Sequence, residues 1–441
     1  MKSVSFLSAF AIALFLFSCS RNPVGDSLTP DDTRQPSPFA VAKSASVSRE
    51  TATVSGAVLS GQVESNNAFA VALYKELLSE DDNLFFSPYS ITAALAMTAA
   101  GAEGETRQQI RDALKVTLDG TDFDAAINSF DQSITSYTDA TEGVTLNIVN
   151  SSWIQANWDF RVSYLDHLSR YYGAGVNLLN FAEEPGACRT VINTWVAEQT
   201  SEKIENLLPE GSIIPTTVLV LTNAIYFLGD WLYSFDPEQT REKTFSRTDL
   251  SEVQAPIMSL NEPDEQVGMY YSRVGNVRAL DFPYKGDRLT MTVLLPDAGE
   301  FSTFESSLST ETINGLISAL DSVELQVSLP KFEFTYGTES LKEAMQALGM
   351  VDAFNDALAD FSGIDGQRLL YVDDIYHKAF ISVDEEGTEA AAATAVSMIW
   401  ESVNPDEVVF NADRPFIYLI RDKETGMILF MGRIVDPTVT E

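Results

Sequence analysis

Apolar side chains recur at helical spacing in the first third of the chain. Phe69 and Leu73 lie four positions apart, which predicts a helix that begins near Val63. A second helix is expected to run from residue 88 to residue 100, because Ser87 suits the N-cap position and Pro88 suits the first turn. This second helix is rich in alanine, and small side chains let a helix approach a flat sheet closely.

Five stretches have the nearly continuous apolar character of strands that are buried on both faces. They are residues 146–154, 218–227, 288–295, 323–329 and 428–434. Helical patterns at 189–200 and 339–348 are interspersed with these stretches, without the regular alternation of a βαβ fold. The sequence therefore predicts an α+β protein.

The N-terminal segment has the features of an export signal. Its apolar run, residues 6–17, is too short to span a bilayer as a helix. The sequence Leu-Phe-Ser-Cys at residues 16–19 looks like a bacterial lipobox, in which Cys19 is diacylated, and two acyl chains give stable anchoring. We therefore expect a signal at residues 1–19 and a cell-envelope lipoprotein. The alternative is an ordinary signal that gives a secreted or periplasmic protein.

A segment of different composition follows the signal. Residues 20–62 are rich in Ser, Thr, Pro, Ala and Asp and show no helical or strand period. This composition predicts a flexible tether whose reach is on the order of tens of ångströms. The folded part would begin at residue 63, and the membrane would be contacted through lipid only.

The charge balance limits the possible partners. The chain of 441 residues carries 64 acidic and 28 basic side chains, a formal net charge of −36. Such a surface repels phosphate backbones, so a nucleic-acid partner is not expected. The acidity suits a well-solvated surface, such as one adapted to a saline medium, or the steering of a basic protease.

Sequence motifs for catalysis are absent. The chain has two histidines, His167 and His377, and neither lies in a motif that pairs a base with a nucleophile. Outside the signal the only cysteine is Cys188, which we expect to be a free thiol. Nucleotide-binding loops, zinc helices and nucleophile elbows are missing as well. We therefore expect no enzyme, no metal and no cofactor.

The most informative segment is residues 384–402, whose first half consists almost entirely of small side chains. As a strand it would place Thr388, Ala390 and Ala392 on one charge-free face. Alanine also has the highest helix propensity, so composition alone leaves an exposed helix equally open.

Several motifs around this segment resemble those of the serpin family. The sequence Glu-Glu-Gly-Thr-Glu-Ala-Ala-Ala-Ala-Thr-Ala at 385–395 resembles the serpin hinge, and Phe-Asn-Ala-Asp-Arg-Pro-Phe-Ile-Tyr-Leu-Ile at 410–420 resembles the C-terminal signature. Further matches are Asn-Leu-Phe-Phe-Ser-Pro-Tyr-Ser at 83–90, Asn-Ala-Ile-Tyr-Phe-Leu-Gly-Asp-Trp at 223–231, Leu-Pro-Lys-Phe at 329–332 and His-Lys-Ala at 377–379.

This resemblance implies one domain over residues 63–437, with three β-sheets, eight or nine helices and an exposed reactive-centre loop. It also implies a metastable native state. After a protease cleaves the loop, the hinge would join the central sheet as a new strand and drag the acylated protease along. The protein would then be a monomeric suicide inhibitor rather than an enzyme. The matched hinge residues are Glu385, Glu386, Gly387, Thr388, Glu389, Ala390, Ala391, Ala392 and Ala393.

Other matched positions have structural roles in the family. Trp231 matches the tryptophan at the top of the sheet where insertion begins, and Lys331 with Glu385 matches a salt bridge near the base of the loop. The residues that match the polar cluster under the central sheet, which controls its opening, are Ser87, Ser90, Asn223 and His377.

The family's usual spacing from the hinge places the scissile bond between Glu401 and Ser402. An acidic specificity residue suits a glutamyl endopeptidase, whereas cleavage after Met398, Ile399 or Trp400 suits a chymotrypsin-, elastase- or subtilisin-like protease. The rival interpretation is a noninhibitory serpin that serves as a binding or surface protein.

Overall fold

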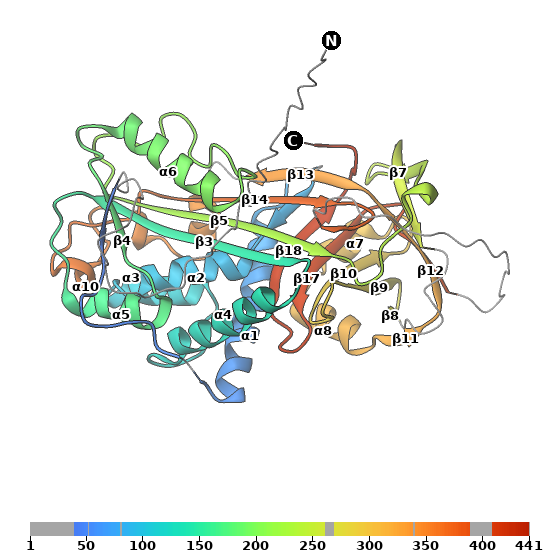
Figure 1. Ribbon diagram of the computed structural model, residues 1–441, viewed down its shortest axis with the longest axis horizontal. Helices are drawn as coiled ribbons and strands as arrows, with labels where there is room; N and C mark the ends of the chain where they lie inside the picture. The colour runs from blue at the N-terminus through green and yellow to red at the C-terminus, as the bar shows by residue number, and fades with distance from the viewer. Residues whose placement is uncertain are drawn as a thin grey trace, which may run out of the picture. The chain divides into compact units, whose positions relative to one another are not determined.

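The computed structural model describes residues 39–440 apart from 52, 80–81, 261–268, 338–339 and 389–407. Within these residues the chain forms three β-sheets, which we name A, B and C, and ten α-helices (Figure 1). The predicted α+β architecture is confirmed. The helix count exceeds the expected eight or nine because it includes short segments such as the four-residue α10.

The helices are α1 (Gly56–Glu76), α2 (Pro88–Ala99), α3 (Gly104–Ala113), α4 (Asp122–Ala140), α5 (Val162–Tyr172), α6 (Pro185–Gln199), α7 (Phe301–Ser306), α8 (Thr310–Ser318), α9 (Lys342–Ala347) and α10 (Ser362–Asp365). Sheet A contains, in spatial order, β1 (Ala40–Ala42), β4 (Val176–Leu179), β3 (Val144–Gln155), β5 (Leu219–Asp230), β15 (Gly387–Thr388), β14 (Asp374–Val383) and β13 (Phe332–Gly337). Sheet B contains β11 (Asp321–Val323), β8 (Met269–Val274), β9 (Val277–Pro283), β10 (Leu289–Pro296), β17 (Phe416–Asp422), β18 (Ile428–Ile434) and β2 (Leu84–Phe86). Sheet C contains β16 (Val408–Asn411), β12 (Leu325–Pro330), β7 (Glu252–Leu260) and β6 (Arg241–Ser246).

The alanine-rich helix α2 packs closely against a sheet, as its composition predicts, and a second sheet contacts its other side. All its residues are buried, and it contacts β3 and β5 of sheet A on one side and β18 of sheet B on the other. Ser87 caps its N-terminus by accepting a hydrogen bond from the backbone N–H of Ser90 (3.1 Å), and Pro88 occupies the first turn. Figure 1 shows α6 on the opposite face of sheet A.

The predicted strands and the two interspersed helices are also present. The strands correspond to β3, β5, β10, β12 and β18, and the helices to α6 and α9. Helix α1 begins at Gly56, seven residues before the predicted start at Val63. The reason is the side chain of Ser55, which caps the helix by accepting a hydrogen bond from the backbone N–H of Val58.

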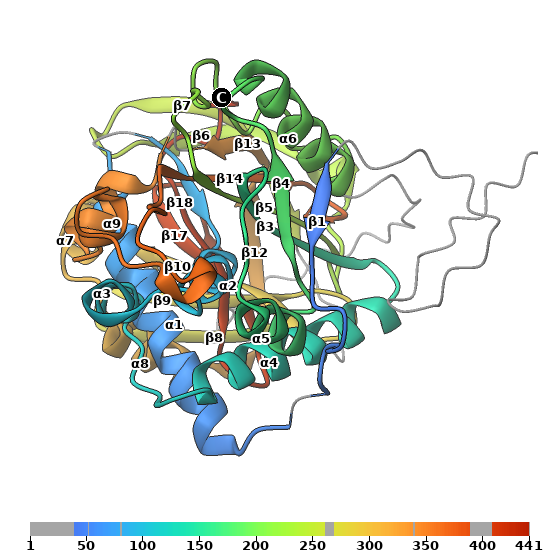
Figure 2. The same cartoon turned by 90° about the vertical axis from the view of Figure 1, so that its left-hand side faces the viewer.

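The predicted tether at residues 20–62 is corrected for its described part, because residues 39–51 and 53–62 include β1 and the start of α1 and belong to the folded body. We call residues 39–50 the strap. Strand β1 of the strap pairs antiparallel with β4 and forms the edge of sheet A (Figures 1 and 2). Phe39 packs edge-on against the buried Trp153, with ring centroids 4.8 Å apart. Backbone pairing with an edge strand needs no apolar period, so composition alone does not indicate it.

Arg49 fastens the other end of the strap to α4. Its Nε donates to Oδ1 of Asn128 (2.8 Å) and its Nη2 to Oδ2 of Asp131 (2.6 Å). The backbone N–H of Glu50 donates to the carbonyl of Arg170 at 2.9 Å, which ties the strap to α5 as well. The strap therefore joins sheet A, α4 and α5.

Several predicted features fall outside the described residues. They include the signal with Cys19, the tether up to residue 38, the hinge residues Glu389 to Ala393, and the loop residues Met398 to Ser402. Across the part of the chain that the structure covers, no helix has the length and apolar character needed to cross a membrane.

Replacing Arg49 with alanine should release the strap. Hydrogen bonds to charged groups contribute about 1.5–3 kcal/mol each, so we expect the free energy of unfolding to fall by about 2 kcal/mol and the amides of residues 40–50 to exchange faster. Arg170→Ala is the control, since its exposed ion pair with Glu50 contributes little. If the amides of the strap are equally protected from exchange in both variants, Arg49 does not hold the strap in place.

Candidate functional site

The first two strand-forming residues of the hinge are already part of sheet A. Strand β15, which consists of Gly387 and Thr388, pairs antiparallel with the end of β5 on one side and with β14 on the other. Further along, β5 and β14 pair directly with each other and run parallel. We call the boundary between β5 and β14 the seam. The hinge thus forms a two-residue wedge at the top of the seam.

Close packing at the wedge explains its small side chains. A Cβ atom on Gly387 would lie 2.1 Å from the carbonyl oxygen of Gly229 on β5, so only glycine fits there. Thr388 is buried, and its Oγ1 lies 2.8 Å from the hydroxyl of Tyr284. Burial raises the pKa of the Tyr284 phenol, which keeps this hydroxyl protonated and able to donate.

Trp231 lies beside the wedge, as the sequence resemblance implies. Its ring stacks on Tyr284, with centroids 4.7 Å apart and ring planes inclined by 11°. Its indole N–H donates to the carbonyl of Asp384 (3.0 Å), just before the hinge. Its backbone N–H donates to the carbonyl of Glu386 (2.8 Å). Trp231 therefore holds the base of the loop through both its side chain and its backbone.

Lys331 and Glu385 meet at the base of the loop. The ammonium of Lys331 lies 2.5 Å from a carboxylate oxygen of Glu385, and the hydroxyl of Thr240 donates to the other oxygen at 2.6 Å. Burial alone would raise the pKa of the Glu385 carboxyl, but the hydrogen bonds from Lys331 and Thr240 outweigh it and hold the pKa below its usual value. The carboxylate is therefore charged at neutral pH and fixes the start of the hinge.

A buried polar cluster crosses the seam below the wedge. Asn223 on β5 and His377 on β14 are register partners, and Oδ1 of Asn223 lies 2.5 Å from Nδ1 of His377. The backbone N–H of Ser87 donates to Nε2 of the same ring (3.3 Å), so the ring proton is on Nδ1 and is donated to Asn223. Burial lowers the pKa of His377 to about 3, so the ring is neutral. The histidine links the two strands by hydrogen bonding, not by charge.

The cluster extends to two further side chains. The Asn223 amide donates to Oγ of Ser90 (2.6 Å) and to Oδ1 of Asn150, which lies on β3. The Asn150 amide donates in turn to the carbonyl of Ser90 (3.1 Å). Side chains from α2, β3, β5 and β14 therefore share one network, and separating β5 from β14 would break it.

The structure thus places the predicted residues in two groups on the same seam. One group surrounds the wedge: Trp231, Lys331, Glu385, Glu386, Gly387 and Thr388. The other is the polar cluster: Ser87, Ser90, Asn223 and His377. His167 lies elsewhere, on α5, with Nε2 3.4 Å from a carboxylate oxygen of Asp124.

Sequence reasoning missed three members of these groups. Asn150 lies in a predicted strand, where an amide side chain between apolar residues was the available signal. Tyr284 and Thr240 carried no signal, because their partners in the hinge are more than a hundred residues away in sequence. The arrangement joins β5 and β14 across one seam of the sheet by hydrogen bonds.

Comparison with known proteins identifies this architecture. The family model described as serpin (serine protease inhibitor) matches residues 64–437. An uncharacterized serpin-like protein of Methanosarcina acetivorans is 37% identical over 373 residues, covering 84% of this chain and 85% of the relative. Antithrombin-III of Homo sapiens is 36% identical over 386 residues, covering 85% and 82%.

Solved structures agree with the sequence comparisons. The thermophilic serpin tengpin in its native state matches with a TM-score of 0.78 and 27% identity, covering 90% of this chain and 99% of tengpin. Uncleaved ovalbumin matches with a TM-score of 0.74 and 25% identity, covering 85% and 100%. The chain belongs to the serpin family of serine protease inhibitors.

Proposed function

We propose that this serpin is inhibitory and traps a serine-type protease as a suicide substrate, by inserting its cleaved loop into the seam. The observation that carries the proposal is the wedge, because Gly387 and Thr388 already occupy the first two positions of a strand between β5 and β14. The protease would be held as an acyl-enzyme and would not be released. The serpin would act once and would not turn over.

Strand insertion has a favourable end state. The seam is a parallel ladder from Asp374 opposite Val220 to Ala379 opposite Ile225. A strand that continues β15 would replace this single parallel ladder with two antiparallel ladders, which are slightly more stable per residue. Insertion therefore gains pairing on both sides of the new strand.

Continuing the register of β15 along β5 gives the length of loop that could be inserted. Gly387 faces Asp230, and the pairing is antiparallel, so each later loop residue would face an earlier residue of β5. Eleven positions further along, Met398 would face Leu219, the first residue of β5. At about 3.3 Å per residue, the inserted strand would be about 36 Å long. A bond cut just after Met398 or a few residues later would carry the protease the full length of β5.

The loop side chains are compatible with this register. Thr388 faces the interior at Tyr284, so Ala390, Ala392 and Thr394 would face the interior as well. None of these carries a charge, and burial of an unpaired charge would oppose insertion.

Replacing Thr388 with arginine should convert the inhibitor into a substrate. The buried position next to Tyr284 cannot solvate a guanidinium, so we expect the yield of SDS-resistant protease complex to fall by about tenfold or more. Thr388→Ser is the matched control, since it keeps the hydroxyl and should retain complex formation. If the wild-type chain forms no covalent complex with any protease that cleaves its loop, the noninhibitory binding role replaces this proposal.

The scissile bond is proposed to be Glu401–Ser402, with Met398, Ile399 and Trp400 as alternative specificity residues. All four positions are at or beyond the end of the insertable stretch, so each permits full insertion. The choice among them decides whether the target is a glutamyl endopeptidase or a chymotrypsin-, elastase- or subtilisin-like protease.

Mass spectrometry of the C-terminal fragment released by a panel of these proteases identifies the bond. We expect the protease that forms the most complex to release a fragment that begins at Ser402. Glu401→Gln should then slow complex formation with that protease by about tenfold or more, because the ionic contact with its pocket is lost. Consistent cleavage after Trp400 would contradict the glutamyl assignment.

We further propose that Cys19 is lipidated and that the chain is held at a bacterial membrane through this lipid. Expression of the full chain in a bacterial host with a labelled fatty acid tests this. The wild type should carry the label and sediment with membranes, whereas Cys19→Ser should lose the label and leave the membrane fraction. An unlabelled wild type with a signal cleaved elsewhere would instead indicate a secreted or periplasmic protein.

A further inference from the structure

The turn between β9 and β10, residues 284–288, contacts the wedge at one residue and the neighbouring end of β5 at another. At its first residue, the Tyr284 hydroxyl is hydrogen-bonded to Thr388. At its second residue, the Lys285 ammonium lies 2.7 Å from a carboxylate oxygen of Asp230, and the Lys285 N–H donates to the Asp230 carbonyl (2.9 Å). Asp230 is the register partner of Gly387. The turn therefore holds Thr388 directly, through Tyr284, and also contacts the strand end beside Gly387.

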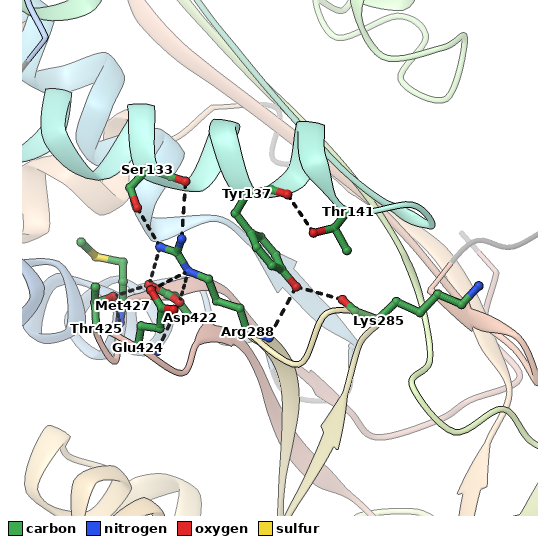
Figure 3. Close-up of polar contacts among 9 residues, drawn as sticks. All are labelled: Ser133, Tyr137, Thr141, Lys285, Arg288, Asp422, Glu424, Thr425 and Met427. Atoms are coloured by element: carbon green, nitrogen blue, oxygen red, sulfur yellow. Dashed lines mark hydrogen bonds and ion pairs between the residues drawn. The ribbon is translucent and has the colours of Figure 1, made fainter.

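Tyr137, near the end of α4, holds both sides of the same turn (Figure 3). Its hydroxyl donates to the carbonyl of Lys285 at 2.8 Å and accepts a hydrogen bond from the backbone N–H of Arg288 at 3.4 Å. Gly286, between Lys285 and Arg288, leaves space for the Tyr137 hydroxyl, because a Cβ at this position would lie 2.5 Å from that oxygen. The φ angle of Gly286 is +81°, a conformation that also favours glycine.

Arg288 fixes Tyr137 and the turn to the rest of the body. Its guanidinium lies over the Tyr137 ring, 5.3 Å from the centroid, and donates to Oγ of Ser133 at 3.1 Å. The same guanidinium donates to both carboxylate oxygens of the fully buried Asp422, at 2.9 and 3.2 Å. Figure 3 shows these contacts joining α4, the turn and the hairpin after β17. The turn is therefore held by a network that does not include the hinge.

We propose that Tyr137 is a positioning residue for insertion. Its two hydrogen bonds hold the 284–288 turn where Tyr284 can retain Thr388 in the seam. Without the Tyr137 hydroxyl the turn moves more freely, the wedge leaves the sheet more often, and insertion must start from an unseated hinge. The link to inhibition rests on the proposed function, whereas the link between Tyr137 and the wedge does not.

Tyr137→Phe tests the link to the wedge in the uncleaved protein, without any protease. The substitution removes both hydrogen bonds and keeps the ring under Arg288. We expect hydrogen exchange of the peptide spanning residues 385–388 to accelerate by about fivefold, the effect of one typical hydrogen bond. Thr141→Val is the matched control: among the residues that the structure describes, the Thr141 hydroxyl at the end of α4 donates to the Tyr137 carbonyl and not to the turn, so its loss should change exchange less than twofold.

A double-mutant cycle with Tyr284→Phe distinguishes positioning from general loosening of the structure. If Tyr137 acts through Tyr284, adding Tyr137→Phe to Tyr284→Phe should produce no further acceleration. Additive effects, or no effect of Tyr137→Phe alone, would overturn the proposal.

Inhibition assays on the same variants separate this inference from the proposed function. With a protease that the wild type traps, Tyr137→Phe should raise the fraction of loop cleaved without complex formation. An unchanged fraction would refute the role in insertion. If exchange responds as expected but the wild type traps no protease, the positioning of the wedge stands and the inhibitory function fails.

Discussion

The structure depends on the parallel pairing of β5 and β14 in sheet A. A second pairing arrangement is possible at this seam, because a strand placed between β5 and β14 would pair antiparallel with both. The hinge already occupies the first two positions of that strand. Sheet A therefore holds a pairing that β15 starts and that is not continued where β5 and β14 pair directly.

Two sets of contacts oppose each other along the seam. The wedge of Gly387 and Thr388 starts the separation of β5 from β14 at the top, and the hydrogen bond between Asn223 and His377 resists it further down. Because His377 is neutral, this resistance does not depend on charge. The 284–288 turn, held by α4, adds a third element that keeps the wedge in place. Hydrogen bonds from several parts of the chain, some buried and some exposed, thus hold the seam and the wedge.

Local sequence patterns predicted most of the fold. The α2 cap at Ser87 and the apolar runs of the strands depend on neighbouring residues, so they can be recognised in the chain itself. The hinge and the polar cluster were found because their motifs resemble those of a known family. The strap and Tyr137 could not be predicted in this way, since an edge pairing and a tyrosine hydroxyl acquire their meaning only from partners distant in sequence.

The most direct test of the account is the fate of the loop after a single cut. The chain would be nicked between residues 398 and 402 by a protease that it does not trap, and then examined by thermal unfolding and amide hydrogen exchange. We expect the nicked chain to unfold at a higher temperature than the intact one, with the amides of residues 389–397 as strongly protected from exchange as those of β5. An unchanged unfolding temperature and rapid exchange in those residues would show that the seam does not accept the loop, and would contradict the account.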